Sequence, residues 1–320
     1  MSLEYWQLQQ RQNLPLDIKI RMSKNRIREW YSHFDGNVYV SFSGGKDSTV
    51  LLHLVRSIYP NVPAVFIDTG LEYPEIRYFV ETKENIKWIK PKMTFKEVIE
   101  KWGYPVISKI VANTVGGAKK GNTRYKKLKG TLKDSDGEKS IFNLEKYQYL
   151  LNAPFKISDK CCYYLKKEPA QRYANKTNRK PILGLMASES KKRERSYLET
   201  GCNAFNIKKP QSQPLAFWTE QDILGYINKN NLKISEIYGD IIKNNHDEYY
   251  LSGENRTGCM FCMFGVHLEK EPNRFQRMMK THPKIYNYCI NKLGLGRVLN
   301  YIDVNYKAPR QQTIFEYHDN

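Results

Sequence analysis

The sequence contains no run of apolar residues that approaches the roughly 20 needed to cross a bilayer. Its first residues, MSLEYWQLQQRQN, also lack the apolar segment of a secretory signal peptide. We therefore expect a cytoplasmic protein. In that compartment structural disulfides are rare, so the six cysteines are expected to be metal ligands, catalytic groups or buried thiols.

Acidic residues are few relative to basic ones. The 320 residues include 33 aspartates and glutamates against 52 lysines and arginines, which gives a formal net charge of +19. Such a charge predicts a polyanionic partner, most simply a nucleic acid such as DNA or tRNA. A basic surface that only aids solubility is the alternative. Hydrophobic residues make up 40% of the chain, enough for a core, and the length fits one large domain or two modest ones.

The stretch VYVSFSGGKDSTVLLHL, residues 38–54, carries the strongest local signal. Its start predicts a short buried strand, and its end has the apolar spacing of a helix. Between them stands Ser43-Gly44-Gly45-Lys46-Asp47-Ser48. Glycines permit a tight turn and a close approach to a ligand, and the start of a helix favours an anion. The spacing differs from that of a Walker loop. We predict a phosphate-binding loop, with Lys46 on the surface of the cradle.

Strand and helix signals alternate along the first half of the chain. Further strands are predicted at 61–68, 86–89 and 181–187. Residues 69–75 are predicted to open a helix that runs to about 83, and a second helix is predicted from 94 to 102. This alternation predicts an α/β fold with a doubly wound, mostly parallel sheet. Ligands of such sheets bind beyond the carboxyl ends of the strands, where the loop and the residues after the second strand would lie. Three regions are expected: a helical cover (1–34), a nucleotide-binding domain (35–235) with a basic insertion (106–150), and a C-terminal region (236–320).

Residues 109–133 contain many basic residues and no acid. The basic residues are Lys109, Lys119, Lys120, Arg124, Lys126, Lys127, Lys129 and Lys133. Four glycines favour flexibility. The segment is either a disordered, solvated loop or one that grips a phosphate backbone and becomes ordered on binding. A second patch of basic and aromatic residues lies at 274–288, for which a solvated helix face is the alternative.

Two cysteine pairs are separated by about a hundred residues. Cys161 and Cys162 are adjacent, in the predicted first turn of a helix, and Cys259 and Cys262 have the C-x-x-C spacing of metal ligands. An adjacent pair is unusual for zinc. Iron–sulfur ligation, structural zinc and unliganded thiols remain open. Cys202 and Cys289 fit no pair and are expected to be buried side chains or reactive thiols.

These motifs resemble the N-type ATP pyrophosphatases, the PP-loop superfamily that includes tRNA thiolation enzymes, the small subunit of ATP sulfurylase and the phosphoadenosine phosphosulfate (PAPS) reductase family. SGGKDS resembles their pyrophosphate loop, IDTGLEYPE (67–75) their Asp-Thr-Gly segment, and PLAFWTEQDI (214–223) a further family segment. In the last of these, Thr219 and Asp222 predict a capping box at the start of a helix. The resemblance spans about residues 35–270. It implies an adenine nucleotide alpha-hydrolase-like, Rossmann-like fold that binds ATP.

The resemblance also implies roles for individual residues. Residues 43–48 would hold the β- and γ-phosphates, Asp68, Thr69 and Gly70 would lie near the adenosine, and Asp47 is a candidate ligand of Mg²⁺. Lys46 and Arg193, which follows the strand at 181–187, would stabilise the leaving pyrophosphate.

The cysteine pattern is similar to the one with which adenylylsulfate reductases hold a [4Fe-4S] cluster. This similarity implies that the cluster's four ligands are Cys161, Cys162, Cys259 and Cys262. Arg256 and Lys160 would offset the negative charge of the cluster.

Two departures from the reductases bear on function. Those enzymes use a cysteine in a C-terminal Glu-Cys-Gly motif, whereas this sequence ends IFEYHDN with no cysteine after Cys289, and it keeps the intact pyrophosphate loop. We expect an ATP-dependent sulfurtransferase, as in Dnd-type DNA phosphorothioation or tRNA thiolation. A nucleic-acid oxygen would attack the α-phosphate, and sulfur from a donor such as a cysteine desulfurase would displace AMP. The alternatives are a PAPS or adenylylsulfate reductase of sulfate assimilation and a non-catalytic nucleic-acid-binding or regulatory protein. A homodimer is also open.

Overall fold

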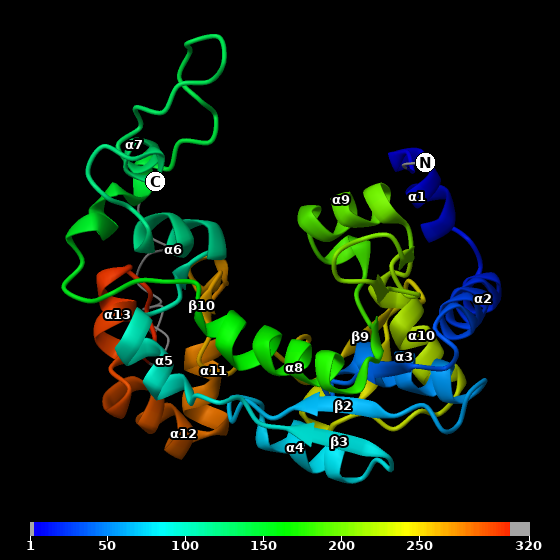
Figure 1. Cartoon of the computed structure of the whole chain (residues 1–320). Coiled ribbons are helices and arrows are strands. Elements are labelled where there is room, and N and C mark those ends of the chain that lie inside the picture. The colour runs from blue at the N-terminus through cyan, green and yellow to red at the C-terminus, as the bar shows by residue number, and fades with distance from the viewer. Residues whose placement is uncertain (1–2, 308–320) are drawn as a thin grey trace, which may run out of the picture. The chain divides into compact units, whose positions relative to one another are not determined.

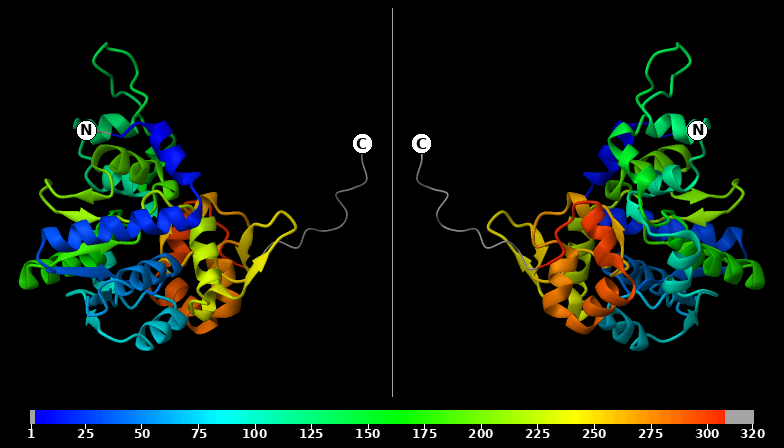
Figure 2. Two further views of the ribbon diagram at one scale, coloured as in Figure 1. Left: turned by 90° about the vertical axis from the view of Figure 1, so that its right-hand side faces the viewer. Right: turned by 90° about the vertical axis from the view of Figure 1, so that its left-hand side faces the viewer.

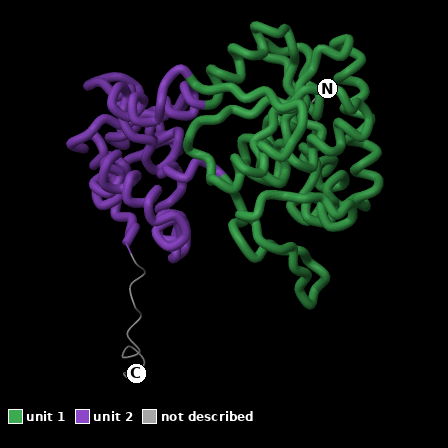
Figure 3. Tube along the Cα trace, turned by 90° about the horizontal axis from the view of Figure 1, so that it is seen from below, with its two compact units in different colours: residues 1–91, 166–257 green, residues 92–165, 258–320 purple. Residues whose placement is uncertain are grey.

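The computed structural model describes residues 3–307, so the C-terminal IFEYHDN lies outside the described residues. Over that range no helix combines the length and the apolar character of a membrane span. The chain forms two compact units (Figure 3): unit 1 combines residues 1–91 with 166–257, and unit 2 combines 92–165 with 258–320. This division differs from the one expected at 34 and 235. The N-terminal helices are part of unit 1, and the basic insertion folds with the C-terminal region.

Unit 1 contains a six-stranded sheet in the order β3-β2-β1-β5-β7-β6. Its strands are β1 (Val38–Ser41), β2 (Ala64–Ile67), β3 (Ile86–Ile89), β5 (Lys180–Leu183), β6 (Asn203–Ala204) and β7 (Gln211–Ser212). All neighbours are parallel except β6 and β7. The expected mostly parallel α/β fold is confirmed. Val40 is fully buried opposite Ala64 and Ile182, as a near-continuous apolar run in a central parallel strand predicts.

Helices cover the sheet of unit 1. In Figure 1, α8 and α4 lie on opposite sides of β2 and β3. The helices are α1 (Tyr5–Gln12), α2 (Leu16–His33), α3 (Lys46–Arg56), α4 (Pro74–Glu81), α8 (Glu168–Thr177), α9 (Lys191–Thr200) and α10 (Glu220–Lys229), with short turns η3 (Ala187–Glu189) and η4 (Glu236–Tyr238). The predicted N-terminal helices and the Thr219–Asp222 capping box of α10 are both present. A hairpin of β8 (Ile241–Lys243) and β9 (Tyr249–Leu251) follows η4.

The strand order reverses direction at β1. Strands β2 and β3 extend the sheet on one side of β1, and β5 begins the extension on the other. Nucleotides bind at such a switch point, outside the carboxyl ends of the strands. Ser43–Ser48 follows β1 and Gly184 follows β5, so both lie there. A Cβ atom added to Gly184 would stand 3.2 Å from the carbonyl oxygen of Asp47, which shows how closely the two segments approach.

Unit 2 is mostly helical and contains one short sheet of two strands. Its strands are β4 (Val106–Ile107) and β10 (Met263–Phe264), which pair in parallel. Its helices are α5 (Phe95–Trp102), α6 (Lys109–Gly116), α7 (Thr123–Leu128), α11 (Arg274–Thr281), α12 (Pro283–Asn287) and α13 (Leu295–Tyr301). Shorter helical segments are η1 (Glu145–Asn152), η5 (Val266–Leu268) and the π-helical η6 (Tyr288–Lys292). The π-helical η2 (Tyr163–Lys167) contains the boundary between the units.

The basic segment 109–133 has regular structure. It contains α6 and α7, and it leads into a hairpin in which Lys133 bridges Lys139 and the side chain of Asn143 bonds to both the N–H and the C=O of Leu132. Figure 2 shows the green loop after α7 extending away from the helices of unit 2. Of the two alternatives for this segment, the disordered loop does not agree with the structure, because local caps and turn hydrogen bonds satisfy its backbone.

A substitution at Gly103 tests the packing of unit 2. Gly103 ends α5 with φ +104°, and an added Cβ atom would lie 2.2 Å from the backbone of Lys156. We expect Gly103→Ala to lower the free energy of unfolding by at least about 2 kcal/mol, because backbone strain adds to a clash with main-chain atoms. Chemical denaturation of the full chain measures this.

Gly225→Ala is the matched control, because a Cβ atom at Gly225 in α10 would meet only ordinary contacts at 3.6 Å and 3.7 Å. It is expected to raise stability by up to about 1 kcal/mol through helix propensity. Equal denaturation midpoints for the two variants would contradict the packing described for Gly103.

Candidate nucleotide and cysteine sites

The phosphate loop has a fixed shape before any ligand binds. Gly44 has φ +73°, and a Cβ atom there would lie 2.7 Å from Val80 and 2.8 Å from Ile76, so only glycine fits beneath α4. The N–H of Ser43 donates to the hydroxyl of Ser48, which in turn donates to the carbonyl of Gly45. Helix α3 begins at Lys46. These contacts hold the loop at a helix N-terminus, the arrangement that suits a phosphate.

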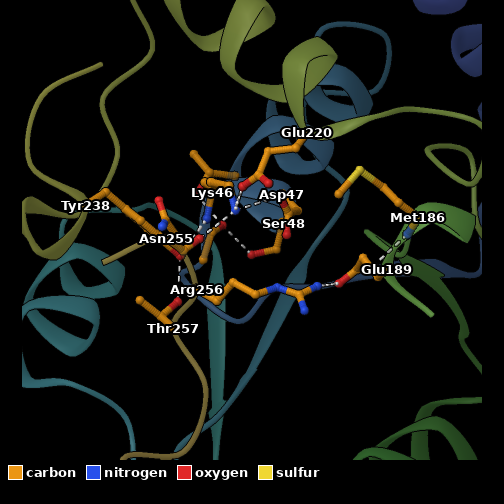
Figure 4. Close-up of polar contacts among 12 residues, drawn as sticks. Lys46, Asp47, Ser48, Met186, Glu189, Glu220, Tyr238, Asn255, Arg256 and Thr257 are labelled. Atoms are coloured by element: carbon orange, nitrogen blue, oxygen red, sulfur yellow. Dashed lines mark hydrogen bonds and ion pairs between the residues drawn. The ribbon is translucent and has the colours of Figure 1, made fainter. Parts of the chain in front are cut away.

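Lys46 is buried, and the expectation that it lies on the surface of the cradle is wrong. Only 4% of the residue is exposed. Its Nζ donates to the carbonyl oxygen of Asn255 at 3.0 Å and lies 3.2 Å from a carboxylate oxygen of Glu220 (Figure 4). Burying an ammonium group is costly unless it is paired, and these two oxygens provide the pairing. Lys46 is thereby held in one conformation.

Tyr238 fastens a second segment to the loop. Its phenol oxygen accepts the N–H of Lys46 at 3.1 Å and lies 2.5 Å from the hydroxyl of Thr257. Burial raises the pKa of Tyr238 to about 12, so the phenol keeps its proton and can donate to Thr257. The N–H of Gly253 donates to the carbonyl of Tyr238 at 3.0 Å, which closes the base of the β8–β9 hairpin. Neither Tyr238 nor Thr257 belongs to a motif that the sequence reveals.

Asp47 carries an unsatisfied carboxylate oxygen. Its Oδ1 is buried without a hydrogen-bond partner and lies 3.7 Å from Nζ of Lys46. Burial raises the pKa of Asp47, and the charges of Lys46 and Arg256 oppose that rise. An orphaned carboxylate oxygen beside a phosphate loop fits a magnesium ion, which commonly takes one or two carboxylates together with phosphate oxygens.

Glu189 pairs with two arginines. Its carboxylate accepts the N–H of Met186 at 2.9 Å, forms an ion pair with Arg193, and lies 2.8 Å from Arg256. Arg193 therefore faces a protein carboxylate. Arg256, expected to offset the charge of a cluster, instead pairs within the phosphate-loop network of unit 1.

The Asp-Thr-Gly segment is held by its own neighbours. Asp68 is buried, pairs with Arg77 at 3.1 Å, and accepts the N–H of Gly70. Thr69 donates to Glu72 through its N–H and its hydroxyl. No atom lies within 4 Å of a Cβ built on Gly70, so its outer side is open. The segment lies at the carboxyl end of β2, the edge at which the phosphate loop follows β1.

The two cysteine pairs flank one extended segment of unit 2. Tyr104 pairs with Ile157 on one side, and Val106 pairs with Met263 on the other, both in parallel. The segment just before Cys161 and the segment just after Cys262 are therefore two strand spacings apart, which is about 10 Å. The two cysteine pairs are thus brought together although the sequence separates them.

The thiols of the four cysteines interact. Cys161 is buried, and the thiol of Cys162 lies close enough to affect its pKa. The side-chain interaction with Cys162, burial, and the charges of Cys162, Cys262 and Cys259 all raise the pKa of the Cys161 thiol. The backbone N–H of Cys262 donates to the carbonyl of Cys259 at 3.0 Å, forming the tight turn that C-x-x-C predicts.

Arg274 supports this turn. It donates to the carbonyl oxygen of Cys262 at 3.0 Å and pairs with Glu269. This residue of the predicted basic and aromatic patch therefore has a local structural role. Phe275, from the same patch, is fully buried.

The donor chemistry of the four thiols fits an iron–sulfur cluster, which requires four thiolates. Within residues 3–307, however, no three or more His, Cys, Asp or Glu side chains already stand in the arrangement of a metal site. The remaining cysteines offer no further ligands. Cys202 and Cys289 are buried, and burial raises the pKa of both thiols, that of Cys202 to about 12. They fit the interpretation as buried side chains.

The mostly parallel sheet with a glycine-rich loop at its switch point defines an α/β protein of the Rossmann-like class, in which ligands bind at that edge of the sheet. Residues 37–108 and 111–263 match the model of the phosphoadenosine phosphosulfate reductase domain. The match includes the phosphate loop and both cysteine pairs. The chain therefore belongs to the phosphoadenosine phosphosulfate reductase domain family of enzymes, as the resemblance of its motifs predicted.

Among curated relatives, the chain is 25% identical over 281 residues to an uncharacterized protein of Methanocaldococcus jannaschii. That alignment covers 85% of this chain and only 52%, about half, of the relative. It is also 26% identical over 239 residues, 74% of each chain, to an adenosine 5'-phosphosulfate reductase of Staphylococcus epidermidis.

Two solved structures are more distantly similar. One is the PAPS reductase of Candida auris, with a TM-score of 0.40 and 17% identity over 78% of this chain and 98% of that one. The other is the U34-tRNA thiolase NcsA of Methanococcus maripaludis with its [4Fe-4S] cluster, with a TM-score of 0.37 and 14% identity over 90% and 81%.

Proposed function

We propose that the protein is an ATP-dependent sulfurtransferase that adenylylates a nucleic acid and then replaces the activated oxygen with sulfur. The observation that carries this proposal is the intact phosphate loop, with Lys46 buried and paired and a buried oxygen of Asp47 that has no hydrogen-bond partner. A site built only to bind an adenylated sulfate has no β- and γ-phosphates to hold.

The first step is adenylyl transfer. An oxygen of the acceptor attacks the α-phosphorus of ATP, the bond from that phosphorus to the bridging oxygen breaks, and pyrophosphate leaves. The loop N–H groups, Lys46 and Arg193 stabilise the charge that develops on the leaving group. Asp47 would hold Mg²⁺ through its buried oxygen, so that the ion offsets the charge of the phosphates.

The second step is displacement of AMP. Sulfur at the oxidation level of sulfide attacks the adenylylated centre, the bond to the activated oxygen breaks, and that oxygen departs with AMP. Cys161, Cys162, Cys259 and Cys262 would hold a [4Fe-4S] cluster, and because all four irons would then be bound by thiolates, the incoming sulfur would be carried beside the cluster. A sulfur-donor protein such as a cysteine desulfurase would replenish it as persulfide sulfur, which a thiol reductant would bring to the level of sulfide by supplying two electrons.

The acceptor is proposed to be a nucleic acid, DNA or tRNA, because the chain carries a net charge of +19. The segment 109–133 would provide many of the contacts with the phosphate backbone of the nucleic acid. Lys119, Lys120 and Lys126 are exposed there, and Lys129 Nζ lies 5.8 Å from the ring centroid of Tyr125. Cations interleaved with an aromatic ring suit a phosphate backbone and a stacked base.

The second candidate is an adenylylsulfate or PAPS reductase, favoured by the name of the Staphylococcus epidermidis relative. A reductase that attacks sulfate needs an accessible cysteine nucleophile. Cys202 and Cys289 are buried, and burial raises their pKa values, so neither supplies one. A non-catalytic binding protein would need neither the buried Lys46 nor the four thiols.

Lys46→Met tests the ATP reaction. Methionine keeps the length of the side chain without its charge, so we expect ATP–pyrophosphate exchange to fall by about 10²–10³-fold, the loss typical of removing one group that stabilises developing charge. Lys243→Met, at an exposed lysine of β8 that pairs with Asp247, is the control and should retain full exchange. Full exchange in Lys46→Met would refute the role of the loop, and reduction of PAPS by the wild type would establish the second candidate.

The four paired cysteines lead to a separate prediction about the metal content of the protein. After anaerobic purification, the wild type should contain about four iron and four sulfide per chain, and serine at any of the four positions should abolish the cluster, because four thiolates are needed. Iron, sulfide and zinc analysis with electron paramagnetic resonance of the reduced protein measures this. Cys289→Ser serves as the control and should keep the cluster. One zinc per chain in place of iron would rule out the proposed cofactor.

Neutralising the basic segment should weaken nucleic-acid binding without changing the ATP reaction measured in its absence. We expect a variant with glutamine at Lys119, Lys120, Lys126 and Lys127 to bind more weakly and to show a salt dependence shallower by about 1 for each lost phosphate contact. A matched variant with glutamine at four exposed lysines of unit 1, Lys87, Lys90, Lys176 and Lys229, keeps the same net charge. Identical salt slopes for the two variants would make the segment an ordinary solvated surface.

A further inference from the structure

One carboxylate, that of Glu189, holds two guanidinium groups beside the phosphate loop. Only 13% of its side chain is exposed, against 66% for Arg256 and 35% for Arg193. Two guanidinium groups on one carboxylate repel each other, and burial together with the charge of Arg256 lowers the pKa of Arg193. A polyanion that bound both arginines would relieve this repulsion.

Arg256 is held at the loop by its neighbours on both sides. Asn255 accepts a hydrogen bond from Lys46 through its carbonyl, and Thr257 bonds to the phenol of Tyr238, which also accepts the N–H of Lys46. Figure 4 shows the side chain of Arg256 passing below Ser48 toward Glu189. Its backbone is therefore fixed at the loop while its guanidinium remains exposed.

A bound anion could also readily replace Glu189 as the partner of Arg256. An ion pair this exposed on the arginine side contributes little stability. A phosphate group carries more charge than a carboxylate, and its geometry matches the two-pronged guanidinium. Asp47 lies within the electrostatic reach of Arg256, so the guanidinium is close to the loop that the phosphates would occupy.

We propose that Arg256 binds the polyphosphate of the nucleotide, and that Glu189 is its partner only while the site is empty. On binding, the phosphate takes the place of the carboxylate at Arg256 and Arg193. The three cations, Lys46, Arg193 and Arg256, would together match a pyrophosphate group better than a single phosphate. The nature of the anion rests on the proposed function, whereas the role of Arg256 can be measured by binding alone.

The test is calorimetric titration of the full chain with inorganic pyrophosphate at constant ionic strength. Arg256→Ala should weaken binding by about 10- to 100-fold, the effect of losing a charge-assisted hydrogen bond. Arg256→Lys should recover part of the loss, since lysine keeps the charge but lacks the two-pronged geometry. Arg195→Ala is the control, because Arg195 lies exposed on α9 in a pair with Glu199 and should bind as the wild type does.

Glu189→Gln separates the resting partner from a merely structural residue. It removes the charge that competes with phosphate, so pyrophosphate should bind at least as tightly as to the wild type. Weaker binding would overturn the assigned role of Glu189. Melting without ligand should be similar for wild type and Arg256→Ala, whereas the stabilisation by pyrophosphate should be reduced in Arg256→Ala.

The outcomes also separate this inference from the proposed function. Wild-type affinity in both Arg256 variants would overturn the inference while leaving ATP–pyrophosphate exchange to decide the function. Binding of pyrophosphate that depends on Arg256, without exchange by the wild type, would support the inference and refute adenylylation. A wild type that binds no pyrophosphate would overturn both.

Discussion

The buried ammonium group of Lys46 makes the contacts on which the arrangement of the candidate phosphate site depends. A charge with 4% of its residue exposed needs oxygen partners, and the carbonyl of Asn255 supplies one of them. That requirement draws the segment 255–257 onto the loop and places Tyr238, Arg256 and Thr257 around it. The loop alone would be a strand-to-helix turn. With this segment in place, the loop is held in one arrangement, with Lys46 buried beneath it and Arg256 beside it.

The two candidate sites are built on different principles. The phosphate loop lies where the parallel sheet changes direction, so its position follows from the strand order. The cysteine set lies in unit 2, around one short extended segment. Strand β4 pairs with β10 on one edge of this segment, and Tyr104, just before β4, pairs with Ile157 on the other edge. There, the short turn from Cys259 to Cys262 and the support of its carbonyl by Arg274 fix the local geometry.

The sequence predicted the features that have local signatures. The strand before the loop, the helix after it and the capping box at Thr219 follow from apolar spacing and from one hydroxyl and one carboxylate three residues apart. The burial of Lys46 was not predictable, since its partners are more than a hundred residues away. The fold of residues 109–133 was missed for a related reason. Glycines and lysines suggested flexibility, whereas side-chain caps such as Asn122 order the segment.

The closure of the β8–β9 hairpin has a consequence for how the chain can vary. The chain leaves the site after Tyr238 and returns at Gly253, where a backbone hydrogen bond joins the two residues. Gly253 is tightly enclosed, because a Cβ atom there would stand 2.4 Å from the carbonyl oxygen of Ile237. Residues 239–252 therefore form a hairpin whose two ends are joined at its base. Insertions or deletions at the tip of this hairpin can therefore arise in evolution without displacing the residues around Lys46. The tip is also a suitable place to attach an engineered segment.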